Sequence, residues 1–166
     1  PHQPRDLRRQ RQMCIRDRAH IAEEIDQPLD LLVRGDSTLR GHFPLELETV
    51  RSAFEERLGI RYDGVVLCPF FAEGGRVTAG DIHWVEESDM MRPVALTEFA
   101  RDTTFGYSRS HLAHWVEEKT GGAVRASDVL SISLEHIRQQ GPQGVCDQLL
   151  QMRPGRVAIV NALTYA

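Results

Sequence analysis

Short apolar runs separated by helical patterns constrain the fold of this chain more than any other feature. The runs DGVVLCP at 63–69 and GRVAIVNA at 155–162 are apolar without alternation and too short for buried helices. Such runs are typical of strands that are covered on both faces in a parallel sheet. A similar run, LDLLV, stands at 29–33. The sequence therefore predicts several buried parallel strands.

Helical patterns lie between these runs. Apolar residues recur at helical spacing over 47–58, after Pro44 at a first helical position, and Gly59 is placed to end that helix. With the runs at 29–33 and 63–69 on either side, this helix completes a predicted βαβ unit.

Further elements are expected downstream. Residues 108–120 predict a helix with a serine cap, and 128–137 predict a short strand that leads into a capped helix. Residues 142–153 predict another helix after a proline, and 69–80 are interpreted as a long loop. Two strand-like runs flank Ser-Asp and predict a hairpin over 81–96. The expected fold is three-layer α/β, with a largely parallel sheet, helices on both faces and a β-hairpin insertion.

Charge is unevenly distributed along the chain. Residues 1–18 hold six arginines against two aspartates, a net charge of +4, whereas the whole chain carries −4. This segment has no aromatic residue for stacking on bases, and its MCIRDR resembles translated sequencing-adapter sequence. We interpret 1–18 as a non-native or disordered leader and 19–166 as the domain, whose acidic balance argues against a nucleic-acid partner.

Composition also indicates the cellular compartment. No apolar run approaches the roughly 20 residues that cross a membrane, and no export signal opens the chain. Three widely spaced cysteines fit a reducing environment. We expect a cytoplasmic protein with no membrane partner; the sequence does not indicate its oligomeric state.

The polar turn RGDSTLRGHF at 34–43 follows the first apolar run and leads into a helix. Ligands of open α/β sheets bind outside the carboxyl ends of strands, and a helix N-terminus favours an anion. Ser37 and Thr38 supply hydroxyl donors, and Arg40 can hold a carboxylate or phosphate through two parallel hydrogen bonds. Asp36 can instead accept protons from ligand hydroxyls. The turn therefore predicts a site for a small polyhydroxy acid.

Two other interpretations of the turn were weighed. Asp36 or Ser37 could simply cap the helix, with the arginines solvated. A P-loop is excluded, because Gly35 and Gly41 are one residue too far apart and no lysine follows.

A second polar stretch, EGGR at 73–76, follows the end of the neighbouring predicted strand. Glu73 and Arg76 can therefore face the first turn, and Gly75 allows backbone amides to approach a ligand closely. The alternative is a surface loop with a solvated arginine.

Other polar and aromatic residues were considered for roles beside the two turns. Asp81 and His83 share one face of a predicted strand, but no third ligand is near, and we expect no protein-bound metal. His83 is either a substrate contact or a packed core residue. The aromatic stretch 105–107 after Asp102 either closes over the site or forms a local core.

These motifs together resemble the sugar-binding N-terminal domain of the four-carbon acid sugar kinases. The resemblance rests on DSTLRG at 36–41, CPFFAEGGR at 68–76 and TEFARDTTFGY at 97–107, and extends over roughly residues 25–166. It implies transfer of a phosphoryl group from ATP, with Mg²⁺, to a hydroxyl of a threonate, erythronate or oxo-tetronate type of acid. The expected substrate-binding residues are Asp36, Ser37, Thr38, Arg40, Gly41, Glu73, Gly75, Arg76 and His83, with Asp36 also the catalytic candidate.

The resemblance also implies parts that this sequence lacks. In the family, a C-terminal domain holds the nucleotide, and an opening strand ends in an Asp-Asp-x-Thr-Gly type of turn. We therefore expect a domain that is incomplete at both ends and inactive alone, and the absent aspartates suit the catalytic role as well as Asp36 does. A non-catalytic sugar-acid-binding module is the alternative function. A third possibility is an unrelated α/β enzyme that binds phosphate at the turn.

Overall fold

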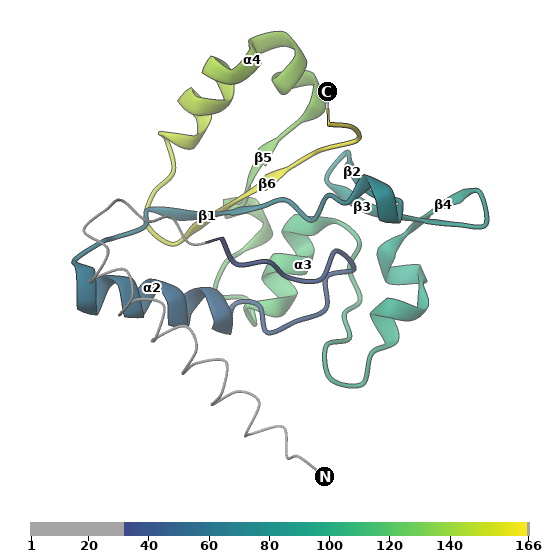
Figure 1. Cartoon of the computed structure of the whole chain (residues 1–166), viewed down its shortest axis with the longest axis horizontal. Coiled ribbons are helices and arrows are strands. Elements are labelled where there is room, and N and C mark those ends of the chain that lie inside the picture. Colours follow the sequence, from purple (N-terminus) through teal and green to yellow (C-terminus); the bar gives the residue numbers. More distant parts are fainter. Residues whose placement is uncertain (1–31, 166) are drawn as a thin grey trace. The chain divides into compact units, whose positions relative to one another are not determined.

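The computed structural model describes residues 32–165, which form two compact units (Figure 1). The smaller unit contains residues 32–34 and 42–62, and the larger contains 35–41 and 63–165. The polar turn at 36–41 therefore belongs to the larger unit. The helices and strands are α2 (Leu45–Leu58), β1 (Gly64–Leu67), β2 (Arg76–Ala79), β3 (Ile82–Glu87), β4 (Met90–Pro93), α3 (Leu112–Lys119), β5 (Leu130–Ile132), α4 (Leu134–Leu149) and β6 (Arg156–Val160). Short 3₁₀ turns are η1 (Ala72–Gly74), η2 (Val94–Leu96), η3 (Glu98–Arg101) and η4 (Ala126–Asp128).

Helix α2 organises the smaller unit. It begins after Pro44 and ends at Gly59, which adopts a left-handed φ of 65° and caps the helix through its backbone N–H. Phe54 is fully buried on α2 and packs against Tyr62, with ring centroids 5.9 Å apart. The predicted helix and its glycine stop are confirmed.

A three-stranded parallel sheet, in the order β1-β6-β5, forms the core of the larger unit. The central strand β6 is the most buried, with Ile159 fully enclosed, as expected for a strand covered on both faces. In Figure 1, α4 is drawn above these strands and α3 below them. This arrangement confirms the α/β class and the strands predicted at 63–69 and 155–162. Helix α4 joins the two helical segments predicted there and is kinked at Gly141, just before Pro142.

The strand predicted at 29–33 is not confirmed. Residues 29–31 lie outside the described part of the chain, and Leu32 and Val33 are not in a strand. Leu32 is 91% exposed, and among the described strands β1 pairs only with β6. The apolar pattern at 32–33 therefore has no sheet partner in the described residues, and the predicted βαβ unit is not seen there.

A second, antiparallel sheet has the order β2-β3-β4. The predicted hairpin is confirmed as β3 and β4, with Ser88 and Asp89 both at positive φ in the turn between them. The long loop predicted over 69–80 is wrong, because this stretch forms η1 and then strand β2, which pairs with β3. Gly74 and Gly75 made this stretch resemble a loop in the sequence, whereas β2 forms because it pairs with β3.

Asn161 connects the two sheets. It follows β6, is 1% exposed, and both accepts a hydrogen bond from the Asp81 backbone N–H and donates one to the Asp81 carboxylate. The Asn161 backbone N–H donates to the carbonyl of Ile132 at the end of β5. The turn between β2 and β3 is thereby held at the carboxyl ends of the parallel strands, the edge where ligands of such sheets bind.

Helix α3 buries the predicted apolar stripe of Leu112, Trp115 and Val116. The prediction of a serine cap for this helix is wrong. The helix begins at Leu112, and the Ser108 N–H instead donates to the carboxylate of Glu118. Among the described residues, no helix has the length and apolar character that a membrane crossing requires.

Candidate functional site

The polar turn at 36–41 is a tight loop stabilised by its own aspartate. One oxygen of Asp36, Oδ1, accepts a hydrogen bond from the Thr38 N–H at 2.9 Å, and the Asp36 carbonyl accepts one from the Leu39 N–H at 3.0 Å. Leu39 has a φ of 64° and is only 4% exposed, and Gly41 has a φ of 149°. The loop thus buries Leu39 and Thr38 and leaves Asp36 and Arg40 partly exposed.

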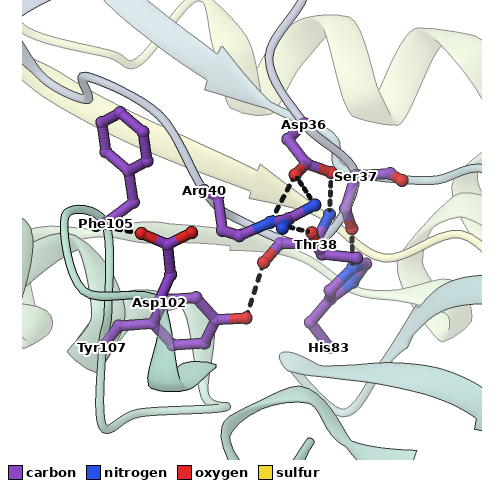
Figure 2. A network of polar contacts seen from close by, with 8 residues as sticks. All are labelled: Asp36, Ser37, Thr38, Arg40, His83, Asp102, Phe105 and Tyr107. Atoms are coloured by element: carbon purple, nitrogen blue, oxygen red, sulfur yellow. Dashed lines mark hydrogen bonds and ion pairs between the residues drawn. The ribbon is translucent and has the colours of Figure 1, made fainter. Parts of the chain in front are cut away.

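Asp36 and Arg40 form a two-pronged ion pair across this loop (Figure 2). Arg40 Nε and Nη2 lie 2.7 and 2.6 Å from Asp36 Oδ2, and the Nε also donates to the Thr38 hydroxyl. Burial alone raises the pKa of Asp36, but the hydrogen bonds from Thr38 and Arg40 outweigh it and lower that pKa. Asp36 is therefore ionised at neutral pH and remains about one-third exposed.

Two side chains from distant parts of the chain hold the loop from beneath. His83 Nε2 lies 2.7 Å from the Ser37 carbonyl oxygen, and the Tyr107 hydroxyl donates to the Thr38 carbonyl at 2.6 Å. Figure 2 shows both contacts reaching consecutive peptide groups. The side chains of His83 and Tyr107 thus anchor two successive carbonyls of the loop backbone.

His83 occupies an interior position. Its ring is fully buried, with Nδ1 3.0 Å from the Thr78 hydroxyl and Nε2 at Ser37. Burial lowers the pKa of His83, the Ser37 contact partly opposes this, and the charge of Arg76 lowers it further. A neutral ring with both nitrogens occupied supports the loop, and it has no exposed surface for the substrate contact considered from the sequence.

Tyr107 belongs to residues 97–107, which we call the clamp segment. Within it, Asp102 Oδ1 accepts hydrogen bonds from the N–H groups of Thr104 and Phe105, both at 2.8 Å. The Gly106 N–H donates to the Asp102 carbonyl at 2.9 Å. These bonds fold the segment into a compact turn that presents Tyr107.

Lys119 on α3 supports the clamp segment from outside. Its Nζ donates to the carbonyls of Phe105 and Gly106 at 2.9 and 2.8 Å, and it lies 5.8 Å from the Tyr107 ring centroid.

Burial, followed by the charge of Asp36, raises the pKa of Tyr107, so its hydroxyl stays protonated and able to donate. Of the two alternatives for 105–107, the structure thus shows the local core, in which Tyr107 is buried and anchors the polar loop.

Arg76 begins strand β2 and lies beside the same loop residues. Its guanidinium carbon is 5.5 Å from the centroid of the Phe99 ring, and that of Arg40 is 5.1 Å from the same ring. The Nε of Arg76 is buried without a hydrogen-bond partner in the described part of the chain. The structure therefore brings together Asp36, Arg40 and Arg76, three of the residues expected to bind substrate.

The remaining predicted residues have other surroundings. Glu73 is exposed and accepts a hydrogen bond of 2.5 Å from the Tyr165 hydroxyl, which lowers the pKa of Glu73. Gly75 has a φ of 68°, and a Cβ there would lie 2.6 Å from Glu86 Cβ. Gly75 is thus required by the turn itself. The Thr38 hydroxyl is buried against Arg40, whereas Ser37 is partly exposed.

The shared strand face expected for Asp81 and His83 is wrong. Asp81 lies in the turn before β3 with a φ of 61°, and its Oδ1 accepts a hydrogen bond from the Ser131 hydroxyl at 2.6 Å. Over residues 32–165, no group of three or more His, Cys, Asp or Glu side chains is arranged to hold a metal ion.

Two residues of this site were not predicted from sequence. Phe99 carries no polar signal, and only its place in the stretch 97–107 pointed toward it. Lys119 is the only lysine in the 166 residues, which is the one signal that could have singled it out.

Comparison with known proteins gives one match in sequence and several in structure. A family model described as a sugar-binding N-terminal domain matches residues 9–166, and no curated protein matches the chain. Among solved structures, a Haemophilus influenzae protein of the DUF1537 family, HI1011, has a TM-score of 0.56 and 13% identity over 79% of this chain. A Salmonella typhimurium LT2 protein provisionally named a tRNA synthase has a TM-score of 0.53 and 18% identity over 78% of it.

These structural similarities are at the level of the fold. The aligned parts cover 29% and 28% of the two solved chains, so this chain spans less than a third of each. At these identities the similarity confirms the α/β architecture, and the family match is what bears on function.

Proposed function

Because the chain belongs to the family of sugar-binding N-terminal domains, we propose that its polar loop and Arg76 bind a four-carbon sugar acid of the threonate, erythronate or oxo-tetronate type. In the whole protein, a hydroxyl of this acid is then phosphorylated by ATP. The nucleotide and its Mg²⁺ are held by residues outside this chain, which supplies the acid-binding part of a kinase.

The observation that carries this proposal is the anchored loop with its exposed charges. His83 and Tyr107 fix the backbone from beneath, while Asp36 and Arg40 keep 31% and 36% of their side chains exposed. A carboxylate placed beside guanidinium groups suits a ligand that carries both hydroxyls and an anionic group. Neither a neutral sugar nor a simple anion would use both kinds of group.

Asp36 has the capacity to orient a substrate hydroxyl. Its Oδ2 already accepts two contacts from Arg40 and its Oδ1 one from Thr38, which leaves a lone pair of Oδ1 for a ligand. Phosphoryl transfer depends mainly on positioning and charge stabilisation. Since the pKa of Asp36 is lowered, its carboxylate is a weak proton acceptor, and we assign it the orientation of the attacking hydroxyl.

Calorimetric titration of the chain tests this proposal. Erythronate and threonate should bind, whereas erythritol, which has the same carbon skeleton without the carboxylate, should not bind at the same concentrations. Preferential binding of erythrose 4-phosphate would instead support a phosphate site. Tetronate binding without ATP-dependent phosphorylation by the whole protein would support a non-catalytic module.

A further inference from the structure

The ring of Phe99 lies against both arginines of the site. The Arg40 and Arg76 guanidinium carbons are 5.1 and 5.5 Å from its centroid. Two like charges so near one ring repel each other, whereas the electron-rich face of the ring attracts each of them. Phe99 therefore offsets the repulsion and brings together two cations that are 36 residues apart in sequence.

The position of Phe99 is itself fixed by the clamp segment. Phe99 lies in η3, which begins directly after Thr97, and the buried Thr97 hydroxyl donates to the Val94 carbonyl at 2.7 Å. On the other side, the carbonyl of buried Ala100 accepts a hydrogen bond from the Tyr107 N–H at 3.1 Å. The clamp segment thus anchors the polar loop through Tyr107 and places the Phe99 ring against Arg40 of that loop.

The two arginines differ in how many of their guanidinium N–H groups remain without a partner. Arg40 directs Nε and Nη2 to Asp36, so most of its charge is paired. Arg76 makes no ion pair with any residue of the described range, and its buried Nε has no hydrogen-bond partner there. A Cβ at residue 74 would lie 2.5 Å from the Phe71 ring and 3.0 Å from Arg76 Nη1, so Gly74 leaves space for both of these side chains.

We propose that Phe99 is a positioning residue that sets the affinity of the site for an anion, by holding Arg40 and Arg76 side by side on its ring. Of the two, Arg76 supplies the charge that binds the ligand carboxylate, while Arg40 stays with Asp36. This inference rests on the proposed function and makes it more specific. With Arg76 held in place, the site prefers a sugar acid to the corresponding neutral polyol.

Substitution of Phe99 by Leu, with Phe99→Tyr as the conservative variant, provides the test. Loss of two cation–aromatic contacts should weaken erythronate binding roughly 5- to 30-fold, whereas the tyrosine ring should restore it. In an Arg76→Gln background, Phe99→Leu should weaken erythronate binding no more than about twofold, because the arginine that binds the ligand carboxylate is gone and Arg40 stays paired with Asp36. Tyr62→Leu, which removes a ring that packs on Phe54, serves as the control.

A second measurement needs no sugar acid. The Nε–H resonances of Arg40 and Arg76 in ¹H–¹⁵N spectra of the free chain should move in Phe99→Leu and stay near their original positions in Phe99→Tyr, with that of Arg125 unchanged. If Phe99→Leu does not fold, Phe99→Met takes its place. Unmoved arginine resonances, unchanged erythronate affinity, or an equal loss in the Arg76→Gln background would overturn the inference. Failure of the unsubstituted chain to bind any tetronate would contradict the proposed function, while the spectra still test Phe99.

Discussion

The pairing of Arg40 with Asp36 depends on the planar fork of the guanidinium group. Arg40→Lys keeps the charge but loses the contact through Nε and Nη2. Since Asp36 and the second arginine are then less well placed, we expect tetronate binding to weaken about 2- to 5-fold, equivalent to roughly 0.5–1 kcal/mol, in calorimetry. Stability should change by less than about 1 kcal/mol, because the pair is partly exposed.

Arg125→Lys is the matched control, because Arg125 Nε also contacts a carboxylate, that of Asp128, at 3.0 Å on an exposed surface. It should leave binding unchanged. A sharp fall in melting temperature of Arg40→Lys with intact tetronate binding would show that Arg40 is structural.

The buried ring of His83 makes stability depend on pH. Its pKa in the folded protein lies below the ordinary value of 6.5, so the unfolded chain takes up a proton first as the pH falls. The stabilisation is therefore present above about pH 6.5 and is lost below it. Denaturant titrations between pH 7.5 and 5 should show the free energy of unfolding falling more steeply for the wild type than for His83→Gln. The exposed His114, changed to Gln, should leave the steep slope in place, and equal slopes for His83→Gln and the wild type would contradict this account.

Two tyrosine hydroxyls in the larger unit allow a direct comparison of buried and exposed hydrogen bonds. Tyr107→Phe leaves the buried carbonyl of Thr38 without its donor and should destabilise the protein by roughly 1–3 kcal/mol in chemical unfolding. Tyr165→Phe removes an exposed bond to Glu73 and should cost less than about 0.5 kcal/mol. Similar costs for both would indicate that the Thr38 carbonyl finds another partner.

At the level of elements, the clamp segment depends on close backbone contact at Gly106. A Cβ at this position would lie 2.6 Å from the Asp102 carbonyl oxygen and 3.0 Å from that of Ala100. Gly106→Ala should therefore distort the turn and destabilise the protein by about 1–3 kcal/mol in thermal unfolding, with weaker tetronate binding through Tyr107. Gly35→Ala, where no atom lies within 4 Å of the added carbon, is the control. Equal tolerance of both substitutions would show that the clamp segment has room to relax.

Elements defined by their own residues were predictable from sequence, and elements defined by a partner were not. The glycine stop of α2 and the apolar strands β1 and β6 carry their signals locally. Strand β2 follows two glycines and exists because β3 pairs with it, so its pattern looked like a loop.

The same distinction applies to the site. The charged residues Asp36, Arg40 and Arg76 stood out because of their chemistry. Phe99 acts only through side chains brought near by folding, so no local pattern revealed it.

For the whole molecule, the proposed separation of acid binding by this chain from nucleotide binding elsewhere gives a further prediction. Incubated with Mg²⁺-ATP and erythronate, the chain should release no ADP in a coupled assay, because its sequence has no P-loop and because we propose that its polar loop binds the acid. The whole protein is the positive control. ADP release above background by the purified chain would contradict the two-part arrangement.

The prediction that residues 1–18 contribute nothing to the fold stays a prediction, because they lie outside the described residues.

Lys119 gives the molecule an unusual chemical property. It is the only lysine in 166 residues, and its Nζ spans the carbonyls of Phe105 and Gly106. Within these 166 residues, an amine-directed reaction at a side chain, whether acetylation, methylation or attachment of a dye, therefore falls on the one ammonium that contacts the segment carrying Phe99 and Tyr107. Acylation would remove the positive charge and disrupt the hydrogen bonds that Nζ makes, so one modification would loosen the clamp segment that anchors the polar loop through Tyr107.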